Sequence, residues 1–277
     1  MNTECLSENT VSLPGGLMLQ QGQFLNTACL RPLSGREEEW LARHRSSPGA
    51  MRVSWLLNSC LLVLGDRQAN RDLVRRLLVA DRDYLVLQLR RLTFGDQVQA
   101  VVPCRKCSQK MDIDFQLNDV PVECRPQRVS SYTIELSDRI IRFRLPTGGD
   151  QEAVLEANSD DMADELMNRC VLDNGGELLS AEEKETVVAE MEQRAPQVEL
   201  ELDLSCPECQ EHFLLSFDTT AFFLDEMAFK SDELLREIHA LAFHYHWSET
   251  EILKLDRRRR RAYLALLNES LRRDWLN

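Results

Sequence analysis

Two Cys-x-x-Cys pairs, Cys104/Cys107 and Cys206/Cys209, lie about a hundred residues apart in this chain of 277 residues. Thiolates two residues apart in a tight turn can bind one metal ion together. Two such turns complete a tetrahedral zinc site with four sulfur ligands. Such a closed site leaves no coordination position for a substrate. The cysteine pattern therefore predicts a structural zinc site and points away from catalysis.

Alternation of apolar and polar residues flanks both pairs. It covers residues 98–102 and 111–115 around the first pair, and residues 200–204 and 213–217 around the second. A period of two residues is typical of half-buried strands, so each pair is expected at the tip of a hairpin. The two hairpins would form the arms of a zinc-ribbon-like region with a large insertion between them.

A thioredoxin-like redox pair is the main alternative for these cysteines. It is disfavoured because such a pair opens a helix, whereas Cys107 and Cys209 lead into strands. If one of the four thiolates is not a ligand, Cys124 and His212 are the nearest substitutes. The other cysteines are expected to be small buried apolar groups, namely Cys5, Cys29, Cys60 and Cys170.

The net charge of −13 is concentrated in one segment. Between Asp150 and Asp203 the chain has 17 acidic and three basic residues, so this segment carries −14 and the rest of the chain +1. A surface of this sign repels nucleic acid and can attract a basic partner. A pair of solvated helices would give the same composition.

Nine cysteines and a polar start without a signal peptide predict a reducing, cytoplasmic location. Membrane insertion is not expected, because the most apolar run, residues 55–64, is too short to span a bilayer and is interrupted by polar residues.

The rest of the chain mixes strand and helix signals, which predicts an α+β fold. Short strands broken at residues 14–16 are expected first, then helices over 34–44, 51–64 and 70–92, the last in two pieces joined around Asp81. Inside the insertion, a hairpin with its turn at Ser137-Asp138 precedes a helix to about 170 and another ending before Pro196. Helices fill the chain from Thr219 to about Trp275.

Three regions follow from these signals. Residues 1–95 hold N-terminal strands followed by helices. Residues 96–218 form the zinc-ribbon-like region, with the acidic α/β insertion at about 120–196. Residues 219–277 form a C-terminal helical segment.

Motifs of the common catalytic sites are missing from the sequence: there is no phosphate-binding loop, nucleophile elbow or His-Glu-x-x-His. His239 and His246 share a face of one expected helix, but two turns separate them by about 10.5 Å, too far for one metal ion. His244 points elsewhere. We therefore expect no enzymatic activity. A metal hydrolase would require one of the four cysteines not to be a ligand.

Five consecutive arginines, Arg257–Arg261, form a basic run near the C-terminus. Such a run can contact nucleic-acid phosphates, and a zinc-ribbon nucleic-acid-binding protein is the alternative function. However, the side chains of consecutive helical residues point in all directions around the helix. They form a basic collar around it and not one surface that could contact the bases of a nucleic acid. The pattern favours pairing with acidic helices or a protein partner.

Several segments resemble one known family. They are Leu13–Leu17, Leu30–Glu38, Asp83–Gly95 and Glu237–Leu253, followed by residues 257–267. On these segments the chain resembles the T-even phage family of baseplate hub assembly chaperones, also found in bacterial contractile-tail and injection-system clusters. The resemblance implies a non-enzymatic assembly factor or structural component with hub or spike proteins as partners, either free in the cytoplasm or incorporated in a phage-tail-like particle.

Overall fold

A four-stranded antiparallel sheet and five helices form the body of the protein. The computed structural model describes residues 9–19, 22–125, 129–136, 139–157, 161–176, 178–229 and 231–274. The strands, in spatial order, are β1 (Thr10–Met18), β2 (Phe24–Leu30), β3 (Leu61–Leu64) and β4 (Arg67–Gln68). The helices are α1 (Gly35–Arg43), α2 (Gly49–Cys60), α3 (Arg71–Arg76), α4 (Val79–Phe94) and α8 (Thr219–Phe229). The largest apolar core lies between them.

The expected break at residues 14–16 is a bulge within one strand. The register of β1 against β2 shifts between Ser12 and Leu17, and Gly16 has a φ of 71°. The N–H of Gly15 donates a hydrogen bond of 2.7 Å to Asp81 on α4. A Cβ at Gly15 would lie 2.9 Å from the Asp81 carboxylate, so the glycine permits this close approach.

Two helix expectations in the body were wrong in detail. The helix expected over residues 51–64 ends at Cys60, and Leu61–Leu64 form β3, because these residues pair with β2 and bury Leu61 and Leu64. The two helical pieces of residues 70–92 join at Leu77-Leu78 instead of Asp81. Leu78 forms a β-bridge with Thr147, which holds its backbone extended.

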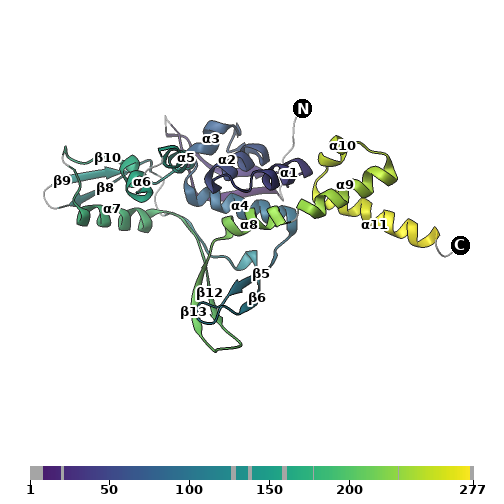
Figure 1. Ribbon diagram of the computed structural model, residues 1–277. Helices are drawn as coiled ribbons and strands as arrows, with labels where there is room; N and C mark the ends of the chain where they lie inside the picture. The colour runs from purple at the N-terminus through teal and green to yellow at the C-terminus, as the bar shows by residue number, and fades with distance from the viewer. Residues whose placement is uncertain are drawn as a thin grey trace.

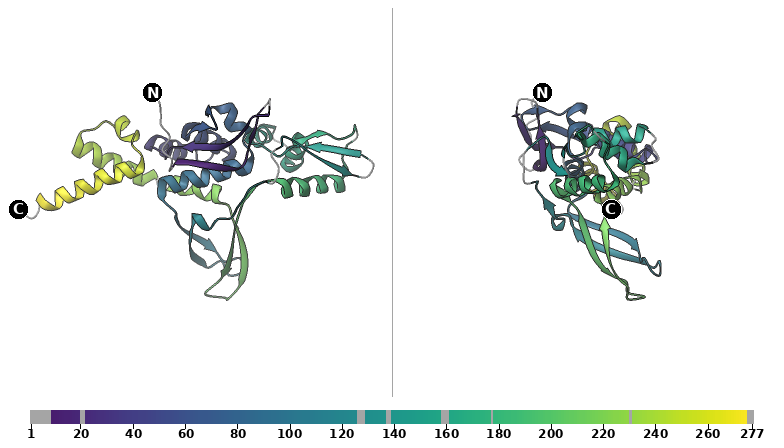
Figure 2. Two further views of the ribbon diagram at one scale, coloured as in Figure 1. Left: turned by 180° about the vertical axis from the view of Figure 1, so that it is seen from behind. Right: turned by 90° about the vertical axis from the view of Figure 1, so that its left-hand side faces the viewer.

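The two cysteine pairs lie at the tips of two hairpins, as expected. The first hairpin joins β5 (Gln97–Pro103) to β6 (Lys110–Gln116), and the second joins β12 (Leu200–Ser205) to β13 (His212–Phe217). Each hairpin is a separate two-stranded sheet. We call the pair the hairpin arm. It projects from the body in all views (Figures 1 and 2).

The hairpins of the arm face each other through apolar side chains. Near the body, Phe115 of β6 and Phe217 of β13 pack edge to face with ring centroids 5.1 Å apart. At this level Val98 and Leu200 are buried in one apolar cluster. Polar residues occupy the opposite faces of the strands, which explains the period of two in the sequence.

A small α/β unit lies between the hairpins in sequence. Its sheet has the order β10-β9-β8, with β8 (Tyr132–Leu136), β9 (Arg139–Phe143) and β10 (Val171–Asp173). Helices α6 (Met162–Cys170) and α7 (Ala181–Arg194) contribute side chains to its separate apolar cluster. We call these elements the β8–β10 unit. The expected hairpin is present, but its turn at Ser137-Asp138 lies outside the described residues.

Two connections attach the β8–β10 unit to the rest of the molecule. At its base, β7 (Val122–Glu123) pairs with β11 (Gln197–Val198). Helix α5 (Gly148–Ala157) contacts α2 and α3 of the body, and Glu152 of α5 forms a 2.9 Å salt bridge with Arg75. The helix expected from residue 150 to 170 is thus two helices, of which α5 belongs with the body.

Three helices follow the body at the C-terminal end of the chain. They are α9 (Ser231–Tyr245), α10 (Glu249–Leu253) and α11 (Arg257–Asp274). They share an apolar cluster that includes Leu241 and Ile252. We call them the C-terminal helices. They lie at one end of the molecule and the β8–β10 unit lies at the other, with the body between them (Figures 1 and 2).

Candidate metal centre

The two cysteine loops have the same backbone geometry. In the first, the N–H of Cys104 donates to the carbonyl of Gln109 at 2.8 Å; in the second, the N–H of Cys206 donates to that of Glu211 at 2.9 Å. The residue after the second cysteine of each pair has a positive φ, 60° at Ser108 and 57° at Gln210. This left-handed residue turns the chain back so that both sulfurs of a pair lie on the same side of the loop.

The fold brings the four predicted sulfurs together. The Sγ atoms of Cys104 and Cys209 are 3.7 Å apart, as are those of Cys107 and Cys206, and all four lie within 4.8 Å of one another. A tetrahedral zinc ion with Zn–S bonds of about 2.3 Å has sulfur–sulfur distances of about 3.8 Å. The cluster therefore has four thiol donors close enough to bind one metal ion, and two of the sulfur–sulfur distances match those of tetrahedral zinc.

The site is partly enclosed by apolar side chains. Cys104 and Cys206 are buried, Cys209 is half-buried and Cys107 is exposed. Met111 and Phe213 pack around the buried sulfurs. One sulfur therefore faces solvent, which gives an ion a path to the site.

Electrostatics in the cluster favour a bound cation. The backbone N–H groups of Cys107 and Lys106 lower the pKa of Cys104 to about 6. The pKa of Cys107 rises to about 12: the N–H of Gln109 acts to lower it, but lost hydration and the neighbouring thiols outweigh this effect. Once one sulfur is ionised, another thiolate so close is disfavoured. A divalent cation removes this repulsion and allows the remaining thiols to ionise.

One ion pair also crosses between the loops. Lys106 in the first loop and Glu211 in the second form an exposed salt bridge of 2.9 Å. An exposed pair of this kind contributes little to stability, because water and salt screen the two charges. It is too weak to hold the tips of two separate hairpins together by itself.

The other candidate ligands do not join the cluster. Cys124 is exposed and lies outside the four-sulfur group, and His212 is exposed with its ring 3.5 Å from the hydroxyl of Ser205. Within the described residues, the four cysteines are the one group of three or more histidine, cysteine or acidic side chains close enough to hold a metal ion together. Neither substitute is needed to complete four ligands.

The remaining cysteines differ from one another. Cys60 and Cys170 are free and buried, and burial raises the pKa of Cys60 to about 12 and that of Cys170 to about 11. Cys29 is also buried but is disulfide-bonded, so it is not a simple apolar thiol. Cys5 lies outside the described residues.

The arginine run does form a collar that pairs with acidic helices. Arg257 and Arg260 are buried, whereas Arg258, Arg259 and Arg261 are exposed. Arg260 donates to Glu38 of α1 at 2.8 Å and to Glu237 of α9 at 2.7 Å. These two carboxylates raise the pKa of Arg260 despite its burial.

Arg257 extends this network. It donates to Glu38 at 3.3 Å and to Glu233 at 2.6 Å, and it lies over the ring of Phe94. Two of the five arginines are therefore engaged inside the protein and are not available to phosphates. The type of pairing could be predicted from the sequence, but the acidic partner Glu38 could not, because it lies on a helix far away in the chain.

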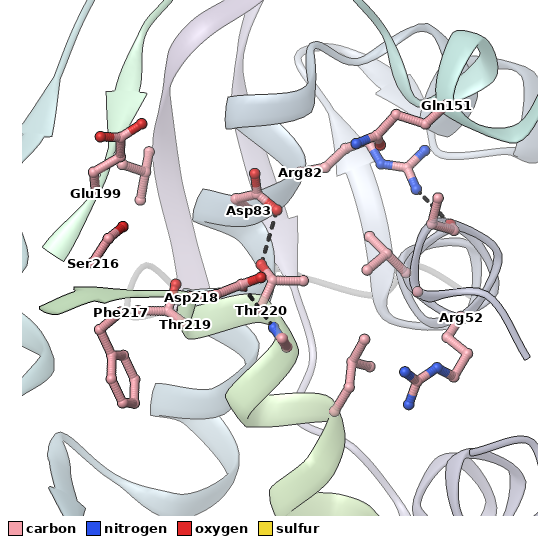
Figure 3. A pocket seen from close by; sticks show the side chains of 16 residues that line it. Arg52, Arg82, Asp83, Gln151, Glu199, Ser216, Phe217, Asp218, Thr219 and Thr220 are labelled. Atoms are coloured by element: carbon pink, nitrogen blue, oxygen red, sulfur yellow. Dashed lines mark hydrogen bonds between the residues drawn. The ribbon is translucent and has the colours of Figure 1, made fainter. Parts of the chain in front are cut away.

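A pocket of about 470 Å³ lies where the hairpin arm joins the body (Figure 3). Asp83 of α4 accepts a hydrogen bond of 2.8 Å from Thr220 at the start of α8, and burial raises the pKa of Asp83. Arg52 and Arg82 line another side. The lining contains no histidine or cysteine. No feature of the sequence pointed to this pocket, because its residues come from five separate segments.

The fold and the site define a mixed α+β protein whose hairpin arm carries a four-cysteine cluster at its tip. A family profile described as T4 bacteriophage base plate protein matches residues 25–225, and the chain belongs to this family. The match covers the hairpin arm, the β8–β10 unit and most of the body; it begins after β1, ends within α8 and leaves out the C-terminal helices. No curated protein and no solved structure matches the chain. In the described residues, no helix is both long and apolar enough to cross a lipid bilayer.

Proposed function

We propose that this protein is a non-enzymatic assembly factor or structural component of a contractile-tail baseplate or injection system, with a structural zinc site. It acts by protein–protein interaction, with hub or spike proteins as its partners. The observation that carries the proposal is the approach of four cysteine sulfurs to within 4.8 Å in a chain of the baseplate family. A chaperone role in hub assembly is the form that the sequence resemblance supports.

Zinc would act as a clamp at the tip of the hairpin arm, held by Cys104, Cys107, Cys206 and Cys209. The two hairpins share no strand pairing, and an isolated two-stranded hairpin is marginal in water. The apolar cluster at the tip is small, with Met111 as its one buried residue apart from two of the cysteines. Metal binding to the folded arm would therefore provide much of the stability of its tip.

A clamped arm offers a partner a rigid surface. Both hairpins project away from the body, and their outer faces carry exposed acidic side chains such as Asp112, Asp114, Glu201 and Asp203. Exposed apolar residues Val101 and Leu214 lie among these charges. The two outer faces point away from each other, and each combines acidic side chains with one exposed apolar residue. Either face suits a partner with a basic rim around an apolar centre.

Co-purification tests the proposal. The full-length tagged chain is expressed with the neighbouring tail genes, and retained proteins are identified by mass spectrometry. We expect the wild-type chain to retain hub or spike proteins, and C104S/C206S, which removes one ligand from each loop, to retain less of them. C124S is the matched control, because Cys124 is an exposed cysteine outside the cluster.

Two outcomes would count against parts of the proposal. If the wild-type chain retains no baseplate protein, the proposed partners are wrong. If C104S/C206S retains these proteins as well as the wild type does, partner binding does not need the clamp, even if the wild-type chain binds the metal.

A further inference from the structure

Helix α7, at one end of the molecule, presents an acidic stripe to solvent. Glu182, Glu185 and Glu192 are exposed and follow one another at helical spacing. None of the three forms a salt bridge with another described residue. Between them lie Ala189 and Val188, and 40% of Val188 is exposed. The stripe therefore has two acidic ends and a small apolar centre.

Helix α11, at the opposite end, presents the reverse pattern. Arg258 and Arg261 lie near its start and Arg272 near its end, and all three are exposed. Exposed apolar side chains lie between them on the same side of the helix, namely Ala262, Ala265 and Leu266, the last with 56% exposed. One acidic residue, Glu269, is exposed on this side too, and it already has an interaction partner. Arg258 and Arg272 have no acidic partner among the described residues.

The two stripes also match in length. Glu182 and Glu192 are ten residues apart, about 15 Å along the helix axis, and Arg261 and Arg272 are eleven residues apart, about 16 Å. An antiparallel or parallel pairing of the helices would place both acidic ends near basic ends and the apolar centres against each other. Each helix alone exposes a surface that the other would cover.

The two helices cannot meet within one molecule. The body separates them, and α7 and α11 lie at opposite ends of the long dimension of the protein (Figures 1 and 2). The contact is therefore available only between different molecules. Any chain that presents the α7 surface also presents the α11 surface.

From this juxtaposition we propose that α11 of one copy docks on α7 of a second copy, so that the protein associates head to tail. The contact is heterologous, because it joins different surfaces of the two copies. Repetition of such a contact generates a ring if the rotation closes and an open chain if it does not. The charges set the register of the two helices but allow either direction, and they make the association sensitive to salt.

Sedimentation velocity of the purified full-length chain tests this proposal. We expect the average mass to rise with protein concentration at about 0.05 M salt and to fall toward the monomer at about 0.5 M salt. R258E/R272E reverses charges at the ends of the α11 stripe, so that both stripes of this variant carry acidic ends. E185K/E192K reverses charges of the α7 stripe, so that both stripes of this variant carry basic ends. Each variant alone should show a self-association Kd raised at least about tenfold.

Mixing the two variants gives the decisive result. In the mixture, the reversed α11 of R258E/R272E matches the reversed α7 of E185K/E192K, and the two unchanged stripes match each other. Association in the mixture should therefore be stronger than in either variant alone and approach that of the wild type. A folding defect in either variant cannot produce this recovery.

R36E/R71E is the matched control for R258E/R272E, because it makes the same change in net charge at two exposed residues of the body. It should associate like the wild type. A wild-type chain that stays monomeric under all these conditions overturns the proposal, as does a mixture that fails to recover. The chain would also stay monomeric if the stripes of α7 and α11 bound only other baseplate proteins, and this outcome too would overturn the proposed contact between copies. Because the readout is the mass of the chain alone, failure here leaves the zinc site and the hub or spike partners untouched.

Discussion

Glu38 and Arg260 form a buried ion pair, 2.8 Å between Oε1 and Nη2, that joins the first helix of the body to the last helix of the chain. Both side chains are almost completely buried, with 2% and 0% exposed. A buried charge is costly unless it is paired and hydrogen-bonded. This pair therefore fixes where the C-terminal helices can dock on the body.

Removal of one partner of this pair should destabilise the protein strongly. R260M removes the buried positive charge that pairs with the carboxylates of Glu38 and Glu237. Because buried charges without a partner are costly, we expect the free energy of unfolding to fall by about 3–5 kcal/mol. R261M removes an exposed arginine that pairs with Glu233, and we expect a change of at most about 1 kcal/mol. Urea unfolding measures both; equal losses in the two variants would contradict the assignment.

Metal analysis should find about one zinc ion per chain, since four sulfur ligands complete one site. C206S should lose most of the metal, whereas C124S and H212A should keep it, because neither residue belongs to the cluster. In hydrogen exchange, C206S should show faster exchange at the tips of β12 and β13 and unchanged exchange in β2 and α4. Metal-free wild-type protein with a fully protected arm would refute the clamp.

Adjacent glycines at the start of α5 should respond differently to alanine. A Cβ at Gly148 would clash with the guanidinium of the buried Arg82, whereas a Cβ at Gly149 meets nothing closer than 3.3 Å. G148A should cost about 1–3 kcal/mol through overpacking. G149A should be neutral or stabilise by up to about 1 kcal/mol, because alanine favours the helix. Thermal unfolding distinguishes the two, and similar melting temperatures would argue against this packing.

Asp81 should make stability fall as the pH rises. Burial raises its pKa from 3.8 to about 6, although the N–H groups of Gly15 and Gly16 act in the opposite direction. Between about pH 4 and 6 the folded state therefore binds more protons than the unfolded state, and a stabilising contribution of about 3 kcal/mol is lost as the pH rises through this window.

The variant D81N isolates this contribution, because asparagine can still accept the hydrogen bond from Gly15 but does not titrate. The difference in unfolding free energy between D81N and the wild type should shift in favour of the variant from pH 4 to pH 6. It should then stay constant up to neutral pH. A difference that is independent of pH across the window would show that Asp81 titrates normally.

Local features of this protein could be predicted well from the sequence. The capping boxes at Ser34, Ser180 and Ser248 begin helices in the structure, and the hairpins around both cysteine pairs have the expected alternation. These features depend on residues within a few positions of one another. Residues 61–64 were misjudged as helix because their apolar run fits a buried strand or a buried helix equally well, and only pairing with β2 decides.

The sequence by itself determined that each Cys-x-x-Cys pair sits in a tight turn between strands, and it placed the excess of negative charge in one segment. Only the tertiary structure decided that Cys104 meets Cys209, that Glu38 pairs with Arg260, and that helices α7 and α11 lie at opposite ends of the molecule. The reason is physical. Turns, caps and strand periods follow from hydrogen bonds and sterics between near neighbours, whereas contacts across more than a hundred residues depend on how the apolar clusters of all the parts pack together.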